Sequence, residues 1–341
     1  MVEQNLEPYI ERLRELPYVR EVSLTHRTAN EDARIEIRTP VRKFALTIEV
    51  KRAYLDRTLT NALVALAARR SAVPLLVLAR YVSQPSGERL AAAGINFVDL
   101  AGNVHLRLGD KYHTFWLGKH EKREKAEGKR PGPAAFQVLF TFLARPEAIQ
   151  WPARQVAGVS GAGKTAAAEA RRRLISNGIL QPLSGGRHSP ANAKALQEDF
   201  IRGYGQVLRP HISLGRFRSA GQDPEEFVER LAAVATRNDL KWALTGGPGA
   251  YELDRFYRGE ETPVFIGART ITEQLKRELK LLPDTRGPIT CLHLFGDAVL
   301  WTGPTRRPIA HPWLIYAELL YQGEPRSLEA AEEIRKNHLE K

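Results

Sequence analysis

Cysteine is nearly absent from this 341-residue sequence, which contains only Cys291. A single cysteine excludes an internal disulfide and any zinc site built from several cysteines. Long hydrophobic runs are missing too, since no apolar stretch approaches the roughly 18 residues that a membrane-spanning helix requires. The first residues, MVEQNLEPYIERLREL, are amphipathic and rich in glutamate, which is unlike a signal peptide. We therefore expect a cytoplasmic protein with no membrane partner.

Acidic residues are too few to balance the basic ones. The sequence has 51 Lys and Arg against 39 Asp and Glu, which gives a formal net charge of +12 at pH 7. Such a surplus is typical of a protein that binds a polyanion, with nucleic acid favoured over a membrane. A basic protein without such a partner is the alternative. The length of the chain predicts two or three domains.

Residues 1–117 carry the pattern of an α/β domain. LEPYIERLREL has apolar residues at helical spacing. Alternating strands follow, with a turn at Thr39–Pro40, and then a helix over TLTNALVALAARR and an apolar strand over VPLLVLARYV. The next segment, residues 118–133, reads GKHEKREKAEGKRPGP and predicts a solvated, charged linker.

An acidic pair with a lysine marks the strands of this first domain. Glu49 and Lys51 are two residues apart, so they share one face of a strand, and Asp32 lies 17 residues before Glu49, at the start of the previous strand. Two carboxylates beside a lysine can hold Mg²⁺ and direct a hydroxide at a phosphate, with Glu11 as a further candidate member. Order and content resemble the restriction-endonuclease-like PD-(D/E)xK fold. That resemblance implies catalytic Asp32, Glu49 and Lys51, with Asp32 and Glu49 as metal ligands. Exposed ion pairs with neighbouring arginines are the alternative.

Residues 158–165, GVSGAGKT, match the phosphate-binding loop pattern G-x-x-x-x-G-K-[ST]. A phosphate loop needs a buried apolar strand before it, but the preceding residues are AIQWPARQVA. We therefore predict that this chain is not an ATPase. Three helices and a strand–turn–strand segment account for the region better, which predicts a winged helix-turn-helix with the glycines between its second and third helices.

The third of these helices can be oriented from its sequence. Ala167, Ala170 and Leu174 recur at helical spacing and predict the buried face. Small and basic residues lie on or flank the opposite face, which suits the major groove of double-stranded DNA. Two further residues are at the tip of the predicted wing. The expected DNA contacts are Lys164, Thr165, Ala168, Arg171, Arg172, Arg173, Arg187 and His188.

From residue 134 to 338 the sequence resembles the AbiEi antitoxins of type IV toxin–antitoxin systems. The segments that carry the resemblance are FQVLFTFLARPE, RQVAGVSGAGKT, RRRLISNGIL, LRPHISLGRF, WALTGGPGA, VLWTG and HPWLIYAELLYQGEPRSLEAAEEI. The resemblance implies a DNA-binding repressor of its own operon. It also implies a separately encoded nucleotidyltransferase toxin that is countered without a stable complex.

The last part of the chain has features of a nucleotidyltransferase without its acidic residues. WALTGGPGA contains a Gly-Gly motif, but TPVFIGA stands where paired acids would bind metal. We predict a degenerate transferase-like α/β domain in which Gly246 and Gly247 form a turn.

Together these patterns predict an α/β, or α+β multidomain, protein. Its expected parts are a restriction-endonuclease-like domain (1–117), a linker (118–133), a winged helix-turn-helix domain (134–218) and a nucleotidyltransferase-like domain (219–341). The predicted function is sequence-specific repression, as the antitoxin of a toxin–antitoxin operon and without a cofactor. A Mg²⁺-dependent DNA endonuclease and a non-specific DNA-binding scaffold are the alternatives. Whether the protein forms a homo-oligomer is left open.

Overall fold

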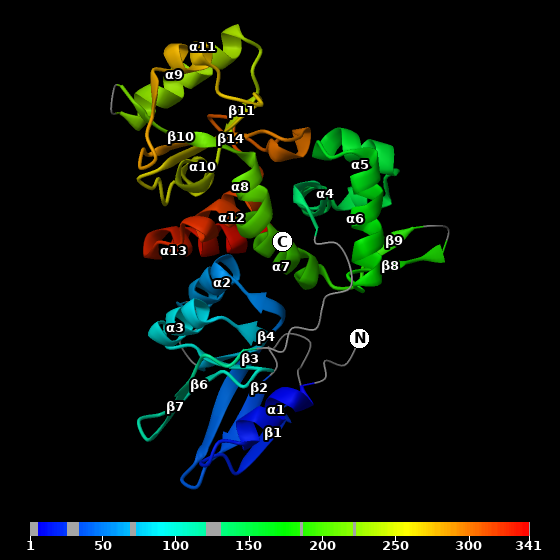
Figure 1. Cartoon of the computed structure of the whole chain (residues 1–341), viewed down its shortest axis with the longest axis vertical. Coiled ribbons are helices and arrows are strands. Elements are labelled where there is room, and N and C mark those ends of the chain that lie inside the picture. Colours follow the sequence, from blue (N-terminus) through cyan, green and yellow to red (C-terminus); the bar gives the residue numbers. More distant parts are fainter. Residues whose placement is uncertain are drawn as a thin grey trace. The chain divides into compact units, whose positions relative to one another are not determined.

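The computed structural model describes residues 6–25, 34–68, 73–120, 131–184, 187–220 and 223–340. The chain divides into two compact units, residues 1–128 and 129–341 (Figure 1). The mixed α/β content predicted from the sequence is confirmed. Among the described residues, the longest helices fall well short of the apolar length that would cross a bilayer.

The first unit is built on a seven-stranded sheet whose strands follow one another in chain order. Strands β3, β4 and β5 run parallel, whereas the pairs β1–β2, β2–β3, β5–β6 and β6–β7 are antiparallel. The elements are α1 (Glu7–Arg14), β1 (Glu21–Thr25), β2 (Arg34–Arg38), β3 (Lys43–Leu55), α2 (Arg57–Ala68), β4 (Leu75–Val82), α3 (Gln84–Ala92), β5 (Asn96–Asp99), β6 (Val104–Leu108) and β7 (Tyr112–Trp116).

Successive side chains along the strands point alternately to the two faces of the seven-stranded sheet. Helix α1 buries Ile10 and Leu13 in a cluster that includes Ile48 of β3 and Leu78 of β4. Glu49 and Lys51 alternate with Ile48 and so point to the opposite face. Glu11 is exposed on α1, so it cannot join Glu49, and its candidate role is wrong.

The order α1, β1, β2, β3, α2, β4 is the element order on which the resemblance to the restriction-endonuclease-like fold rested. That fold assignment stays a prediction. Helix α3 and strand β7 were not predicted. The Ser86 side chain at the start of α3 donates a hydrogen bond to the Leu55 carbonyl, 3.0 Å away, which ties this helix to the end of β3.

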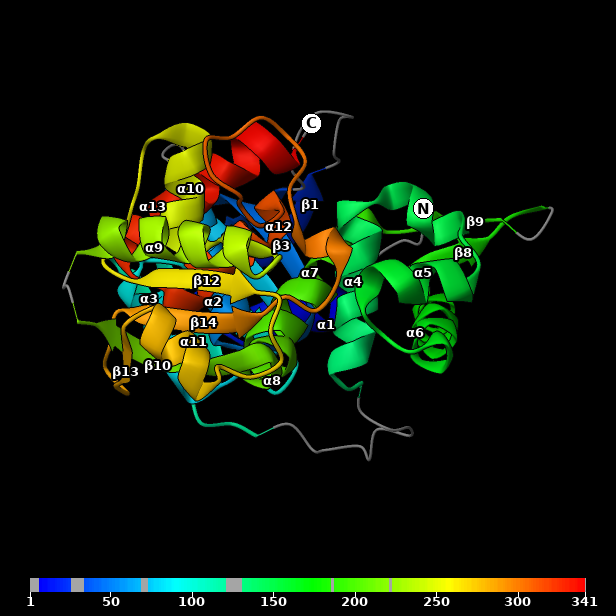
Figure 2. The ribbon, with the colours of Figure 1, turned by 90° about the horizontal axis from the view of Figure 1, so that it is seen from above.

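In the second unit, residues 131–190 form a segment that we call the helix–hairpin segment. It contains α4 (Pro133–Ala144), a 3-10 helix (Pro146–Gln150), α5 (Ala153–Ser160), α6 (Lys164–Ser176) and the two-stranded antiparallel hairpin of β8 (Leu180–Pro182) and β9 (His188–Pro190). The three helices and the hairpin appear where the sequence predicted them. In two views the hairpin projects away from the rest of the unit (Figures 1 and 2).

The rest of the second unit is organised around a five-stranded sheet with the order β11-β12-β14-β10-β13. Its elements are α7 (Ala193–Gly203), a π-helix (Tyr204–Leu208), α8 (Arg209–Ile212), β10 (Ser213–Ser219), α9 (Pro224–Arg237), β11 (Trp242–Leu244), α10 (Gly246–Asp254), β12 (Thr262–Ile266), α11 (Glu273–Glu278), β13 (Leu281–Pro283), β14 (Ile289–His293), α12 (Pro312–Gln322) and α13 (Pro325–Ile334). Only β12 and β14 pair in parallel.

This topology corrects the predicted boundary near residue 218. The sequence placed residues 213–218 at the irregular end of the middle domain, but they form β10, which pairs with β13 and β14 of the five-stranded sheet. The helical region also continues past Pro210 to Ile212. Pro210 follows the π-helix Tyr204–Leu208 in a continuous helical run, and such a bulge is a common place for the intrahelical hydrogen-bond ladder to be interrupted.

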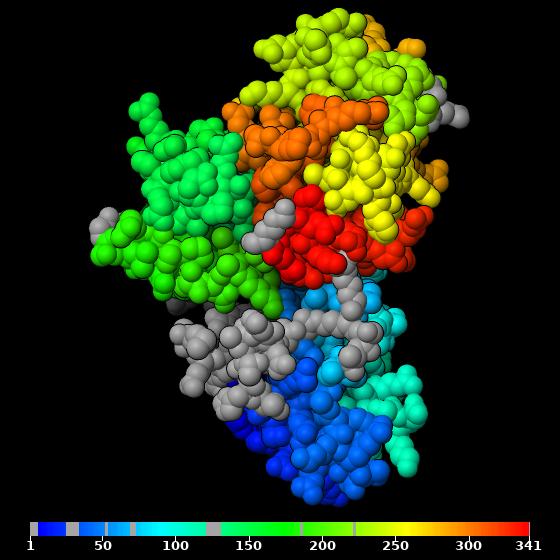
Figure 3. Space-filling view, turned by 180° about the vertical axis from the view of Figure 1, so that it is seen from behind, coloured from blue at the N-terminus to red at the C-terminus, as the bar shows by residue number. Residues whose placement is uncertain are grey.

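The helix–hairpin segment packs directly on the rest of its unit. A Cβ atom added to Gly161 would lie 1.5 Å from the Phe295 carbonyl oxygen, and one added to Gly296 would lie 2.4 Å from the Val159 carbonyl oxygen. The Phe140 ring of α4 also contacts the Phe295 ring, at a centroid distance of 5.8 Å. Figure 3 shows the orange part of the chain lying against the green helix–hairpin segment. Backbone meets backbone here, which requires glycine on both sides.

Candidate nucleic-acid interface

Helix α6 begins and ends as its sequence dictates. The segment KTAAAEARRRLIS is rich in alanine and arginine, which favour helix. It ends at Gly178, which adopts a left-handed conformation with φ +66°. The N–H groups of Gly178 and Ile179 donate to the carbonyls of Ile175 and Leu174, both at 2.9 Å, in a Schellman arrangement. Gly178 therefore closes the helix.

The turn before α6 explains the phosphate-loop pattern. Helix α5, and not a strand, precedes it, and Gly161 ends that helix with φ +70°. Gly163 then caps α6, so that Lys164 is the first residue of the helix. The predicted turn between two helices is confirmed. Within GVSGAGKT, Gly161 is required because it has positive φ and packs closely on Phe295.

The inward face of α6 is the predicted one. Ala167, Ala170 and Leu174 are buried, with at most 3% of their surface exposed. Thr165, Glu169 and Arg172 are exposed, and Ala168 is half-buried. Because these four residues recur at helical spacing, they form a stripe opposite the buried face. We call them the outer stripe of α6.

The charged residues of the outer stripe have no partner among the described residues. No hydrogen bond or ion pair is formed by the side chains of Arg172 and Glu169, nor by Lys164 next to the stripe, within the part of the chain that the structure describes. Many other arginines of the second unit do form ion pairs. These side chains are therefore free to meet a ligand.

Arg171 and Arg173 differ from Arg172 because they are used inside the protein. The Arg171 guanidinium donates to the Trp151 carbonyl at 2.5 Å, and its burial lowers the pKa of the group. The Arg173 guanidinium lies 3.5 Å from the Asp199 carboxylate of α7. Both arginines hold α6 to its neighbours, so we correct their assignment as DNA contacts.

The hairpin is held in place by an unpredicted glutamine. The Gln150 side-chain oxygen accepts a hydrogen bond from the His188 N–H at 3.0 Å, and its amide donates to the His188 carbonyl. This double contact pins the start of β9 to the 3-10 helix. Arg187 is exposed, whereas His188 is half-buried. Of the two predicted wing contacts, Arg187 is thus the more accessible.

Arg154 is a further exposed arginine that the sequence did not single out. It is the second residue of α5, two positions after Pro152, and it forms no ion pair with any described residue. The sequence does contain a cue to Arg154, because Pro152 marks the start of a helix. A side chain in the first turn of that helix is available to a phosphate. Residues 131–190 contain seven Lys and Arg and only two acids, so this segment is strongly basic.

The predicted nuclease residues lie in a different environment. Asp32 is outside the described residues. The Lys51 ammonium lies 2.8 Å from the Glu49 carboxylate, with only 9% and 4% of these side chains exposed. The alternative of exposed ion pairs is therefore wrong for Glu49. Among the described residues, no group of three or more His, Cys, Asp or Glu could hold a metal ion.

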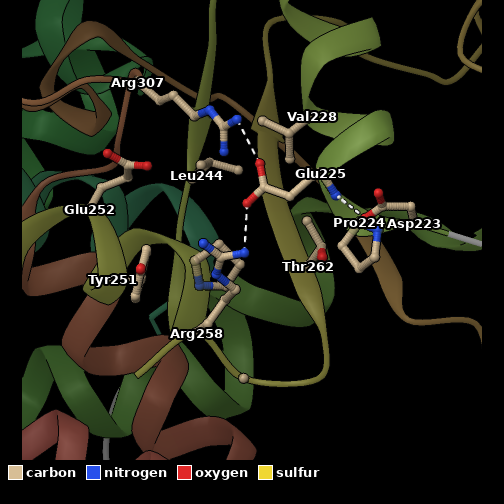
Figure 4. A pocket seen from close by; sticks show the side chains of 12 residues that line it. Asp223, Pro224, Glu225, Val228, Leu244, Tyr251, Glu252, Arg258, Thr262 and Arg307 are labelled. Atoms are coloured by element: carbon tan, nitrogen blue, oxygen red, sulfur yellow. Dashed lines mark hydrogen bonds and ion pairs between the residues drawn. The ribbon is translucent and has the colours of Figure 1, made fainter. Parts of the chain in front are cut away.

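The C-terminal part of the second unit contains a small pocket of about 90 Å³ (Figure 4). Arg307 and Arg258 approach the Glu225 carboxylate at 2.6 Å and 2.8 Å. The hydrogen bond from Arg307 is the main reason why the pKa of Glu225 is lowered. Asp223 and Glu252 also line the pocket, so acids outnumber arginines. This lining gives the pocket no surplus of positive charge with which to bind a phosphate.

The Gly-Gly motif does not form the predicted turn. Gly246 and Gly247 begin helix α10, and a Cβ atom on Gly247 would lie 2.2 Å from the Arg258 carbonyl oxygen. Packing thus requires glycine at position 247, whereas Gly246 has a left-handed backbone with φ +54°. The segment TPVFI forms strand β12, which is fully buried.

Residues 191–340 match the sequence model of a family described as "Transcriptional regulator, AbiEi antitoxin, Type IV TA system". The predicted resemblance to the AbiEi antitoxins is confirmed over these residues, and the family is one of transcriptional regulators. Residues 134–190, which carry the basic helix and hairpin, lie outside the match. Neither a curated protein nor a solved structure matches this chain significantly.

Proposed function

We propose that this chain is a sequence-specific DNA-binding repressor that acts as the antitoxin of a type IV toxin–antitoxin operon. In this proposal residues 131–190 are a winged helix-turn-helix, with α6 as the recognition helix in the major groove. The hairpin of β8 and β9 is the wing beside the phosphate backbone. DNA binding needs no cofactor, and the functional partner is a separately encoded nucleotidyltransferase toxin.

One observation carries this proposal. The outer stripe of α6 combines Arg172 and Thr165 with small Ala168, and its charged members have no partner among the described residues. An unpaired arginine beside small side chains can approach the base edges closely, and arginine makes a bidentate contact with guanine. The match to a family of transcriptional regulators supports the same function independently.

The surrounding groups supply affinity rather than sequence preference. Arg187 on the hairpin and Arg154 at the start of α5 are exposed and suited to phosphate contacts. Such contacts depend on salt, because each one releases counterions from DNA. Arg171 and Arg173 support the helix from behind. Occupancy of a promoter by this segment would exclude the polymerase and so repress transcription.

Arginine variants test the proposal on DNA from upstream of the chain's own gene. Arg172→Ala should weaken binding to the specific site by about 1–3 kcal/mol and relax the preference at one base pair. Arg187→Ala should weaken binding to all DNA similarly and reduce the salt slope by about 1. Equilibrium titrations with specific and random duplexes measure both quantities.

Arg237→Ala is the matched control, because Arg237 is 66% exposed on α9 and its loss changes the net charge equally. It should leave the sequence preference unchanged. If Arg172→Ala instead loses affinity equally for specific and random DNA, Arg172 has no role in base reading. The scaffold alternative would then replace the repressor.

A further inference from the structure

Glu169 is a carboxylate on a helix that also carries Lys164 and three consecutive arginines. It is exposed in the outer stripe of α6, between Thr165 and Arg172. An acid at this place repels DNA phosphates and weakens binding to every sequence. Its presence on a DNA-binding face therefore needs a separate explanation.

Internal structure does not provide that explanation. Glu169 forms no hydrogen bond or ion pair with any described residue. Arg173, four residues later on α6, is held by Asp199 instead. Glu169 is the sixth residue of α6, beyond the first turn where the N–H groups favour an acid.

The major groove offers such a carboxylate one good partner. A glutamate accepts a hydrogen bond from the N4 amino group of cytosine, whereas arginine pairs with the O6 and N7 atoms of guanine. Glu169 and Arg172 are three residues apart, a rise of about 4.5 Å along the helix. That spacing is comparable to the roughly 3.4 Å between base pairs, so the two side chains reach the same or neighbouring steps.

We propose that Glu169 is a specificity-determining residue that accepts a hydrogen bond from a cytosine N4 amino group next to the guanine that Arg172 contacts. The inference rests on the proposed function, since it names the DNA that the recognition helix prefers. Glu169 lowers the affinity for all DNA, but least for sequences with cytosine at this position. It thereby widens the gap between the specific site and random DNA.

Selection from a randomised duplex library tests this assignment with the full-length protein. Wild type should select a motif with an invariant cytosine beside a guanine. Glu169→Gln should change the preferred base from cytosine towards adenine, because glutamine makes a bidentate contact with adenine. Glu169→Ala should reduce the discrimination at that base pair by about tenfold or more and bind random DNA at least as tightly as wild type.

Glu147→Gln is the matched control, since Glu147 is the other acid of residues 131–190 and is exposed on the 3-10 helix. It should raise the affinity for all DNA slightly and leave the selected motif unchanged. A wild-type motif that persists unchanged in Glu169→Gln and Glu169→Ala would overturn the inference alone. A wild-type protein that selects no motif would overturn the repressor function and the inference together.

Discussion

His311 gives the second unit a pH dependence that can be calculated from its surroundings. Its ring lies among the aromatic rings of Phe140 and Trp301, at centroid distances of 5.9 Å and 5.2 Å. Burial, and secondarily the charge of Arg145, lowers the pKa of His311 from 6.5 to about 4. The neutral ring also accepts a hydrogen bond through Nδ1 from the Trp313 N–H at 3.3 Å, which caps α12. Protonation would remove this acceptor.

The direction of the effect follows from the two pKa values. The unfolded chain binds the proton near pH 6.5, whereas the native state binds it only near pH 4. The stability that the neutral ring provides is therefore present above pH 6.5 and is lost as the pH falls towards 4. At pH 5 these pKa values correspond to a loss of about 2 kcal/mol in the free energy of unfolding.

His311→Asn is the variant for this measurement, because asparagine caps a helix well and does not titrate. The free energy of unfolding in urea is measured at pH 7.5 and pH 5, with hydrogen exchange of α12 as the probe. His311 caps the start of this helix. Between these pH values, wild type should lose about 2 kcal/mol more than the variant. If wild type and variant lose the same free energy of unfolding between pH 7.5 and pH 5, His311 is not held neutral by burial and the reasoning is refuted.

Three further predictions concern the turn, a buried ion pair and the glycine-rich loop. Gly161→Ala should lower the free energy of unfolding of the second unit by at least the roughly 1–2 kcal/mol cost of a left-handed alanine. The new Cβ atom would also lie 1.5 Å from the Phe295 carbonyl oxygen. Gly158→Ala is the control in urea unfolding and should not destabilise, because its Cβ atom would have no atom within 4 Å. Glu318→Ala should lower the free energy of unfolding by about 3–5 kcal/mol, since it leaves the buried Arg209 guanidinium without the carboxylate 2.9 Å away. Glu273→Ala, at an exposed glutamate, is the control and should change the urea unfolding midpoint little. Equal losses of stability in the two variants would contradict the prediction. Calorimetry should detect no ATP binding, and micromolar binding that disappears in Lys164→Ala would contradict the helix–turn–helix account of GVSGAGKT.

Periodicity made parts of this architecture predictable. The buried face of α6 follows from Ala167, Ala170 and Leu174, because helical spacing alone decides which side chains share a face. The turn at Gly161 was predictable for a similar local reason, since glycine tolerates positive φ. Strand alternation likewise placed Glu49 and Lys51 on one face.

The errors concern features that depend on distant partners. Arg171 and Arg172 are neighbours in sequence, and only the position of the Trp151 carbonyl shows that one is internal and the other free. Strand β10 was missed because its pairing with β14 joins residues far apart in the chain. Gly246 and Gly247 were assigned to a turn because their close packing, on Pro263 and Arg258 respectively, has no local signal.

The most direct test of the central claim is the affinity of the full-length protein for DNA upstream of its own gene. Titrations at about 0.15 M salt, where the Debye length is about 8 Å, compare this DNA with a shuffled duplex of the same composition. A sequence-specific repressor should bind its site at least about 10³-fold more tightly than the shuffled duplex. The account predicts such a ratio and its collapse in Arg172→Ala. Equal affinity for both duplexes would contradict it.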